Sequence, residues 1–295
     1  MHSIFLHLRI PFSFFLLPVF LFASVFHYSN IYWEEWFILF GILHVLVYPA
    51  SNAYNSYMDQ DEGSIGGLEH PPKATKGLFW TANIMDISAA ILAFSLLSET
   101  TAWILLIYIL ISRSYSYRGI RLKKYPVIGF IAVALLQGTG VYLMVALLPG
   151  ALIDIDQAVA GGFLSFLMIG AGYPLTQIYQ HEADQKDGVL TLSRLLGIRG
   201  TFIFSSICFI LLGVGWLFYF WRYLSAFWIG CISMGIALLP VFLYFNYWMK
   251  LTWNDPKEAS FSRTMKMNLI SSWCSNMWLI FLFFVENQGF LFGIQ

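Results

Sequence analysis

Two clusters of amides and carboxylates stand where long apolar stretches of the chain end. The first cluster runs from Asn52 to Glu62. Residues three or four apart are neighbours on one face of a helix, and the polar residues that lead into this cluster have that spacing: His44, Tyr48, Asn52, Asn55 and Asp59. This pattern predicts a polar groove whose acidic end can bind a cation.

The second cluster lies further along the chain, between Tyr173 and Gly188. The same helical spacing relates Tyr173, Gln177, Gln180 (or its neighbour His181) and Asp184. The repetition predicts two related halves. A competing interpretation treats the amides as interhelical hydrogen-bond partners and the acids as a solvated loop.

The composition is too apolar for a soluble domain. Of 295 residues, 59% are hydrophobic and only 11% are charged, and the mean hydropathy is +0.70. We therefore expect an all-α polytopic membrane protein, a single transmembrane domain over residues 1–295 that is surrounded by membrane lipids. We expect no nucleic-acid partner.

Stretches of about twenty apolar residues predict nine transmembrane helices. Their expected ranges are 11–28, 35–57, 79–97, 102–117, 126–149, 158–180, 200–220, 225–249 and 267–285. With the amino terminus in the cytoplasm, every Lys and Arg except Arg222 falls on or near the inner side, as the positive-inside rule requires. Both acidic clusters then face the cytoplasm, which we expect to be that of a bacterium, with the protein in its cytoplasmic membrane.

The chemistry that these residues allow is the binding of a metal–phosphate complex. Mg²⁺ takes one or two protein carboxylates and completes its shell with water and phosphate oxygens. Candidate ligands are Asp59, Asp61, Glu62, Asp184 and Asp187. A diphosphate at the mouth of an apolar, aromatic-rich cavity implies a long hydrocarbon tail, and therefore a polyprenyl diphosphate.

Two basic segments adjoin the first cluster. The loop from Gly63 to Gly77 carries Lys73 and Lys76, which together with Arg118 could neutralise phosphate charge, and loops of this length often act as lids. The stretch from Arg118 to Pro126 could equally be a topogenic signal or a contact to anionic lipid. Asp86, inside the third predicted helix, is a functional candidate that we expect instead to form an interhelical hydrogen bond.

Together the motifs resemble the UbiA superfamily of intramembrane prenyltransferases, whose hallmark is two Asp-rich motifs at the cytoplasmic ends of helices 2 and 6. The resemblance covers most of the chain. Besides the acidic clusters it includes Arg9-Ile10-Pro11, Tyr115-Ser116-Tyr117-Arg118, Lys123-Lys124 and the segment from Gly188 to Gly197.

The resemblance implies a nine-helix bundle that uses Mg²⁺, a polyprenyl diphosphate donor and usually an aromatic or quinone-precursor acceptor. It implies catalytic roles for Asn55, Asp59 and Asp184. Residues expected to bind substrate are Asn52, Lys73, Lys76, Tyr115, Arg118, Lys123, Tyr173, Gln177 and Gln180.

The chain departs from the family pattern at one position in each acidic motif. Gly63 stands where the first motif usually has its last acid, and Gln180 stands where the second motif usually has its first aspartate. The predicted function is Mg²⁺-dependent prenyl transfer to a small acceptor. The alternatives are a secondary transporter, since two similar halves with polar helix ends also describe a transporter, and a catalytically degenerate isoprenoid-lipid-binding protein.

Overall fold

The computed structural model describes residues 2–28, 32–60, 63–148 and 154–287, and within these ranges it contains helices and one isolated β-bridge but no strand. The α-helices are α1 (His2–Leu8), α2 (Leu17–His27), α3 (Trp33–Gly41), α4 (Tyr48–Asp59), α5 (Lys76–Leu96), α6 (Glu99–Ser116), α7 (Pro126–Ala134), α8 (Val141–Ala146), α9 (Ile155–Gly172), α10 (His181–Lys186), α11 (Leu192–Tyr223), α12 (Phe227–Asn254) and α13 (Phe261–Glu286). The 3₁₀ and π segments are η1 (Ile10–Phe15), η3 (Ile42–Val47), η4 (Leu122–Lys124), η5 (Leu135–Gly140), η6 (Tyr173–Gln180) and η7 (Pro256–Glu258).

Each predicted transmembrane stretch is mainly helical where the structure describes it. Among the described residues, seven helices are long and apolar enough to cross a membrane, and the bent pair His2–Phe15 and Leu17–His27 would make an eighth. The predicted span 102–117 corresponds to α6, which is not among them. The all-helical architecture is confirmed, and the count of nine spans is approximate.

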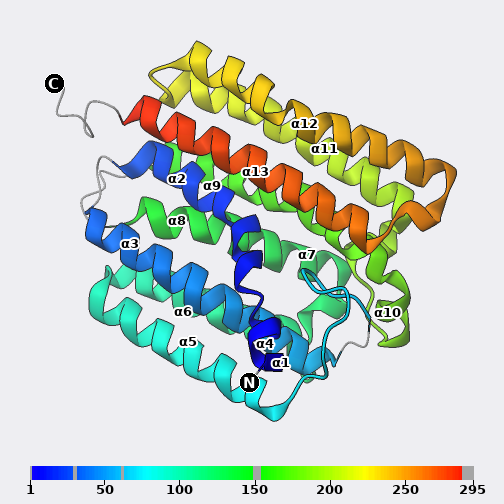
Figure 1. Cartoon of the computed structure of the whole chain (residues 1–295). Coiled ribbons are helices and arrows are strands. Elements are labelled where there is room, and N and C mark those ends of the chain that lie inside the picture. Colours follow the sequence, from blue (N-terminus) through cyan, green and yellow to red (C-terminus); the bar gives the residue numbers. More distant parts are fainter. Residues whose placement is uncertain (1, 29–31, 61–62, 149–153, 288–295) are drawn as a thin grey trace.

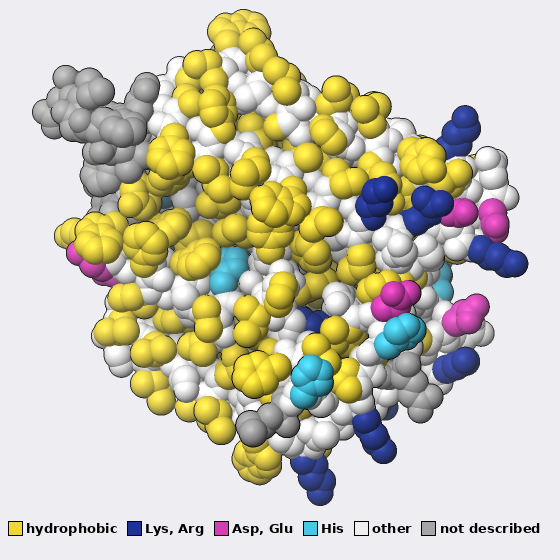
Figure 2. Space-filling model, in the orientation of Figure 1, with side chains coloured by type: hydrophobic (Ala, Val, Ile, Leu, Met, Phe, Trp, Pro, Cys, Tyr) yellow, Lys and Arg dark blue, Asp and Glu magenta, His cyan; other side chains and the backbone are white. Residues whose placement is uncertain are grey.

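The long helices lie side by side in one bundle (Figure 1). The end of α4, the short helix α10 and the connection between α12 and α13 lie toward the same end of this bundle. Figure 2 shows that the charged side chains on the visible face gather mostly at this end, whereas hydrophobic side chains cover most of the rest. A bundle with one charged end and apolar flanks is the form expected of a membrane-spanning protein.

Several helices depart locally from α-helical geometry. The π segment η3 precedes α4, and the 3₁₀ segment η6 lies between α9 and α10. A π turn holds more residues than an α turn, so it shifts the face that a helix presents. His44 lies within this π segment, whereas Tyr48 is the first residue of α4 and keeps its α-helical spacing to Asn52. Both are core residues: the His44 ring stacks on Phe40 with centroids 4.5 Å apart, and Tyr48 is fully buried.

Asp86 of α5 forms the expected contact between helices, and its partner is Arg113 of α6. Nε of Arg113 donates to Oδ2 of Asp86 at 2.6 Å, and Nη2 donates to the carbonyl oxygen of Ala82 at 2.9 Å. The Arg113 guanidinium also lies over the ring of Tyr54 in α4, 3.9 Å from its centroid. This ion pair therefore joins three neighbouring helices.

Candidate active site

The end of α4 presents the first acidic motif. Asp59 is the last residue of α4, and the helix ends because Gln60 adopts a left-handed conformation with φ 55°. Nδ2 of Asn55 donates to Oδ2 of Asp59 at 2.9 Å and to Oγ of Ser116 in α6 at 3.0 Å. Asn55 therefore orients the carboxylate of Asp59, which is only 8% exposed.

Two cations approach this buried carboxylate from the turn after α6. Arg121 is left-handed, with φ 53°, and it leads into η4, which contains Lys123. Nζ of Lys123 lies 2.5 Å from Oδ2 of Asp59, and Nη2 of Arg121 lies 3.6 Å from Oδ1. A buried carboxylate is costly unless it is paired, and these two cations offset that cost for Asp59. Oδ1 of Asp59 has no hydrogen-bond donor among the described residues.

The two aspartates of the second acidic motif, Asp184 and Asp187, have different surroundings. Asp184, in α10, lines the central cavity described below. Asp187 lies beyond α10, does not line that cavity, and forms ion pairs with Arg121 and, at 3.4 Å, with Arg118. Partial burial of Asp187 would raise its pKa, but the hydrogen bond and charge of Arg121, with Arg118 and Lys123, outweigh it and lower the pKa. Asp187 is thus engaged with arginines outside the cavity.

Side chains of η6, the segment that precedes α10, take part in a hydrogen-bonded chain. The hydroxyl of Tyr173 shares a short hydrogen bond with the hydroxyl of Tyr115 in α6, and Nε2 of Gln177 donates to the Tyr173 hydroxyl at 2.9 Å. Nε2 of Gln180 donates to the carbonyl oxygen of Ser64 in the loop after α4, at 3.2 Å. The amide of Gln180 therefore connects the second motif to this loop.

These residues surround one cavity of about 820 Å³. The predicted site residues that line it are Asn52, Asn55, Asp59, Tyr115, Lys123, Tyr173, Gln177, Gln180 and Asp184. Much of the remaining wall is apolar and aromatic, with side chains that include Phe209, Leu212, Trp216, Leu238 and Phe242. The cavity thus joins a polar mouth to an apolar interior.

Other predicted site residues lie elsewhere. Lys73 and Lys76 are exposed and are not part of the cavity wall, and neither is Arg118, whose Nε donates to the carbonyl oxygen of Met58 at 2.7 Å. Asp61 and Glu62 lie outside the described residues.

Sequence reasoning left out several residues that the structure brings to the site. Arg9 lines the cavity, and its guanidinium donates to the carbonyl oxygens of Gly66 at 2.9 Å and Asn52 at 3.0 Å. Residues 63–66 of the expected lid loop also line the cavity. Arg9 belongs to the Arg9-Ile10-Pro11 motif and Arg121 to the basic stretch from Arg118 to Pro126, so the sequence held a signal for both. Their contacts could not be predicted, because they depend on the left-handed conformation of Arg9 and Arg121.

The described residues contain no group of three or more His, Cys, Asp or Glu side chains that could hold a metal ion. Two carboxylates, Asp59 and Asp184, line the cavity in this part of the chain. That is the number that Mg²⁺ commonly takes from a protein when phosphate oxygens and water supply its other ligands. Oδ1 of Asp59 also has no hydrogen-bond donor among the described residues, so it is available as a ligand. The carboxylate oxygens of Asp59 and Asp184 therefore fit Mg²⁺ that is bound together with a phosphate-bearing ligand.

The apolar helices and the cavity with its polar mouth define an integral membrane protein that can hold an amphipathic ligand. A family model, the UbiA prenyltransferase family, matches residues 15–270. The chain belongs to this family. The predicted family and the helical membrane fold are thereby confirmed.

Individual relatives agree with this assignment. The digeranylgeranylglyceryl phosphate synthase of Methanoculleus marisnigri is 28% identical over 176 residues, which are 58% of this chain and 61% of that protein. A UbiA homolog from Archaeoglobus fulgidus, bound to DMAPP and Mg²⁺, has a TM-score of 0.69 at 16% identity and covers 96% of this chain and 98% of that chain. The same homolog bound to GPP and Mg²⁺ has a TM-score of 0.68 at 16% identity, over 96% and 99% of the two chains. At 16% identity, the similarity to these solved structures shows a shared fold and nothing further.

Proposed function

We propose that this chain is a Mg²⁺-dependent transferase that moves a prenyl group from a prenyl diphosphate to a small acceptor inside the membrane. The observation that carries this proposal is the pair of carboxylates, Asp59 and Asp184, which come from separate helices and line the polar mouth of one largely apolar cavity. The Archaeoglobus fulgidus homolog binds DMAPP or GPP with Mg²⁺, and both ligands are prenyl diphosphates. The proposal places the same type of ligand here.

The polar mouth would hold the diphosphate. Asp59 and Asp184 would hold Mg²⁺, which when bound neutralises diphosphate oxygens and stabilises the leaving group. Lys123 and Arg9 also line the cavity, and an ammonium or guanidinium group can form charge-assisted hydrogen bonds to phosphate oxygens. Asn55 keeps the Asp59 carboxylate in place through its 2.9 Å hydrogen bond.

The apolar interior would hold the prenyl chain and exclude water. When the bond between the allylic carbon and the diphosphate oxygen breaks, its electron pair leaves with the diphosphate. The acceptor supplies the electron pair of the new bond and loses a proton. Aromatic side chains of the cavity wall can stabilise positive charge that develops on the prenyl group.

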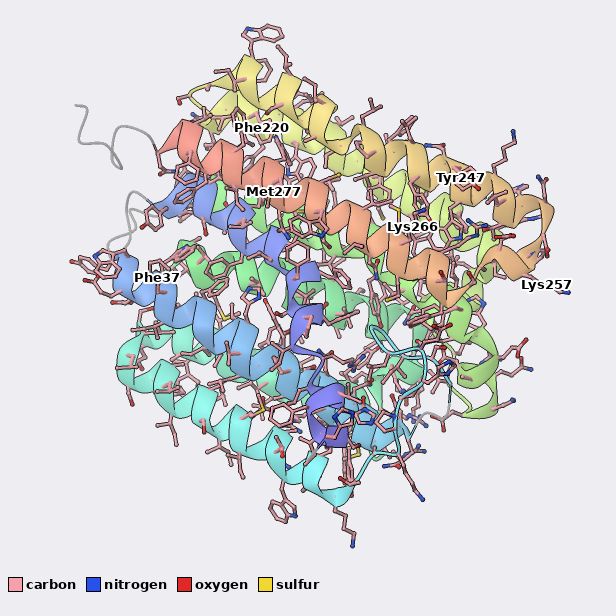
Figure 3. The ribbon with its side chains drawn as sticks, in the orientation of Figure 1. Phe37, Phe220, Tyr247, Lys257, Lys266 and Met277 are labelled. Carbon is pink, nitrogen blue, oxygen red and sulfur yellow. The ribbon has the colours of Figure 1, made fainter. Side chains whose placement is uncertain are left out.

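The acceptor has two candidates. The aromatic or quinone-precursor acceptor stays a prediction from the resemblance. A glyceryl phosphate is the second candidate, because the relative from Methanoculleus marisnigri is named a digeranylgeranylglyceryl phosphate synthase. We further propose that the acidic end of the bundle faces the cytoplasm, since Lys257 and Lys266 also lie toward that end, opposite Phe37 and Phe220 (Figure 3).

A turnover assay tests this function. Purified protein in lipid nanodiscs is incubated with labelled prenyl diphosphates of several lengths and with a hydroxybenzoate or a monoprenylated glyceryl phosphate, in Mg²⁺ or in EDTA. We expect a prenylated product that requires both the acceptor and Mg²⁺. Binding of the donor without any product across the acceptor panel would instead favour a catalytically degenerate lipid-binding protein.

A further inference from the structure

The hydrogen-bonded chain of Tyr115, Tyr173 and Gln177 is incomplete at one end. Gln177 is only 7% exposed and lines the cavity. Its Nε2 donates a hydrogen bond to the Tyr173 hydroxyl at 2.9 Å. Its Oε1 is buried and accepts no hydrogen bond from the described residues. A buried polar atom without a partner costs free energy that a ligand can recover.

The donor substrate cannot supply the missing hydrogen bond. A prenyl diphosphate consists of a hydrocarbon chain and ionised phosphate oxygens, which accept hydrogen bonds but do not donate them. A hydrogen-bond partner of Oε1 must therefore carry an O–H or N–H group. Since Gln177 shares the cavity with Asp59 and Asp184, such a group would lie in the same cavity as the proposed donor site.

We propose that Oε1 of Gln177 binds a hydroxyl group of the acceptor substrate, and that the chain is therefore selective for acceptors with a free hydroxyl. This inference rests on the proposed function. The hydroxybenzoate and the glyceryl phosphate share this chemistry, so the subsite admits either. Tyr173 holds the amide in place from one side, and its own hydroxyl is held by Tyr115, so the subsite is organised before the acceptor arrives.

The structure also provides a matched control in the same segment. Thr176 lines the cavity next to Gln177, but its hydroxyl already donates to the carbonyl oxygen of Tyr173 at 2.7 Å. Replacing Gln177 with Met removes the free acceptor and keeps an unbranched side chain of similar length. Replacing Thr176 with Val removes a hydroxyl that is already bonded.

Equilibrium binding without turnover tests the proposal. Protein in nanodiscs with Mg²⁺ and inorganic diphosphate is titrated with each labelled acceptor and with its O-methyl ether. We expect the wild type to bind at least one hydroxyl acceptor on the order of ten-fold more tightly than its ether. We expect Gln177→Met to abolish this preference, Thr176→Val to retain it, and the affinity for diphosphate to stay unchanged in both.

Three results would overturn the proposal. The first is equal binding of hydroxyl and ether by the wild type, which is informative even if the variant does not fold. The second is a preference for the hydroxyl that survives in Gln177→Met. The third is a weaker affinity for Mg²⁺ and diphosphate in Gln177→Met with acceptor binding unchanged, because the amide would then serve the donor. Since no step of this test requires turnover, its outcome is separate from that of the turnover assay.

Discussion

At the scale of single residues, Lys123 and Lys124 are neighbours in one turn but have different surroundings. Lys123 is buried and contacts Asp59 at 2.5 Å, whereas Lys124 is exposed and its ammonium group lies over the ring of Tyr125, 4.9 Å from the centroid. We expect Lys123→Ala to raise the KM for the prenyl diphosphate by about 10- to 100-fold, since a hydrogen bond to a charged group contributes about 1.5–3 kcal/mol.

The matched control for this prediction is Lys124→Ala, which we expect to leave the KM within about two-fold of the wild type because surface charges contribute little. Steady-state kinetics at saturating Mg²⁺ measures both values. Equal effects of the two substitutions would mean that the basic turn acts through its overall charge, and that the contact of Lys123 with Asp59 has no special part in donor binding.

Residue type and spacing predicted the central members of the site but not the side chains that pair with them. Asn55, Asp59 and Asp184 could be found because polar residues on an apolar helix face stand out. Asp187 has the same signal, yet it lies outside the cavity, where it forms ion pairs with Arg118 and Arg121. No periodic pattern shows that Arg121 will be left-handed, so these ion pairs could not be predicted from the sequence.

At the scale of elements, α4 and α6 are held in one register by repeated polar contacts. Oγ of Ser51 lies 2.7 Å from Oγ of Ser112, and one helical turn later Asn55 donates to Ser116. Between these contacts, Arg113 stacks on Tyr54 and pairs with Asp86 of α5. The ion pair therefore supports the register that brings Ser116 to Asn55.

Breaking this buried ion pair should destabilise the bundle. We expect Asp86→Asn or Arg113→Met alone to cost about 3 kcal/mol, because each leaves an uncompensated group in an apolar environment. The double variant Asp86→Leu with Arg113→Met should cost less than the sum of the single changes, since it leaves no unpaired charge. Thermal unfolding in detergent measures all variants, and additive losses would show that the pair is not coupled.

Hydrophobic stretches predicted where the helices lie, but not their local geometry. The 3₁₀ segment η6 follows a residue pattern that also suits an α-helix, and its residues Tyr173, Gln177 and Gln180 line the cavity nevertheless. His44, within the π segment η3, and Tyr48, the first residue of α4, both lie in the core instead. Such segments depend on packing against other helices, which a single-chain pattern does not contain.

At the scale of the whole molecule, the cavity depends on helices that are far apart in the sequence. α4, α6, η6, α10, α11, α12 and α13 all contribute to its wall, as do Arg9 near the amino terminus and the loop after α4. The two acidic motifs line the same cavity because the bundle places the end of α4 and the helix α10 beside it. We propose that Asp59 and Asp184 act together on one Mg²⁺ and diphosphate.

The most direct test of this claim is a Mg²⁺ titration of prenyl transfer in Asp59→Asn, Asp184→Asn and Asp156→Asn. Asp156 is exposed in the first turn of α9, at the end of that helix away from the acidic motifs, and serves as the control. We expect both site variants to lose at least 100-fold in kcat/KM at any Mg²⁺ concentration, as the loss of electrostatic stabilisation in a transition state commonly costs. The control should titrate like the wild type. Near-normal turnover at an unchanged Mg²⁺ requirement in either site variant would contradict the account, because that carboxylate would then not be a metal ligand.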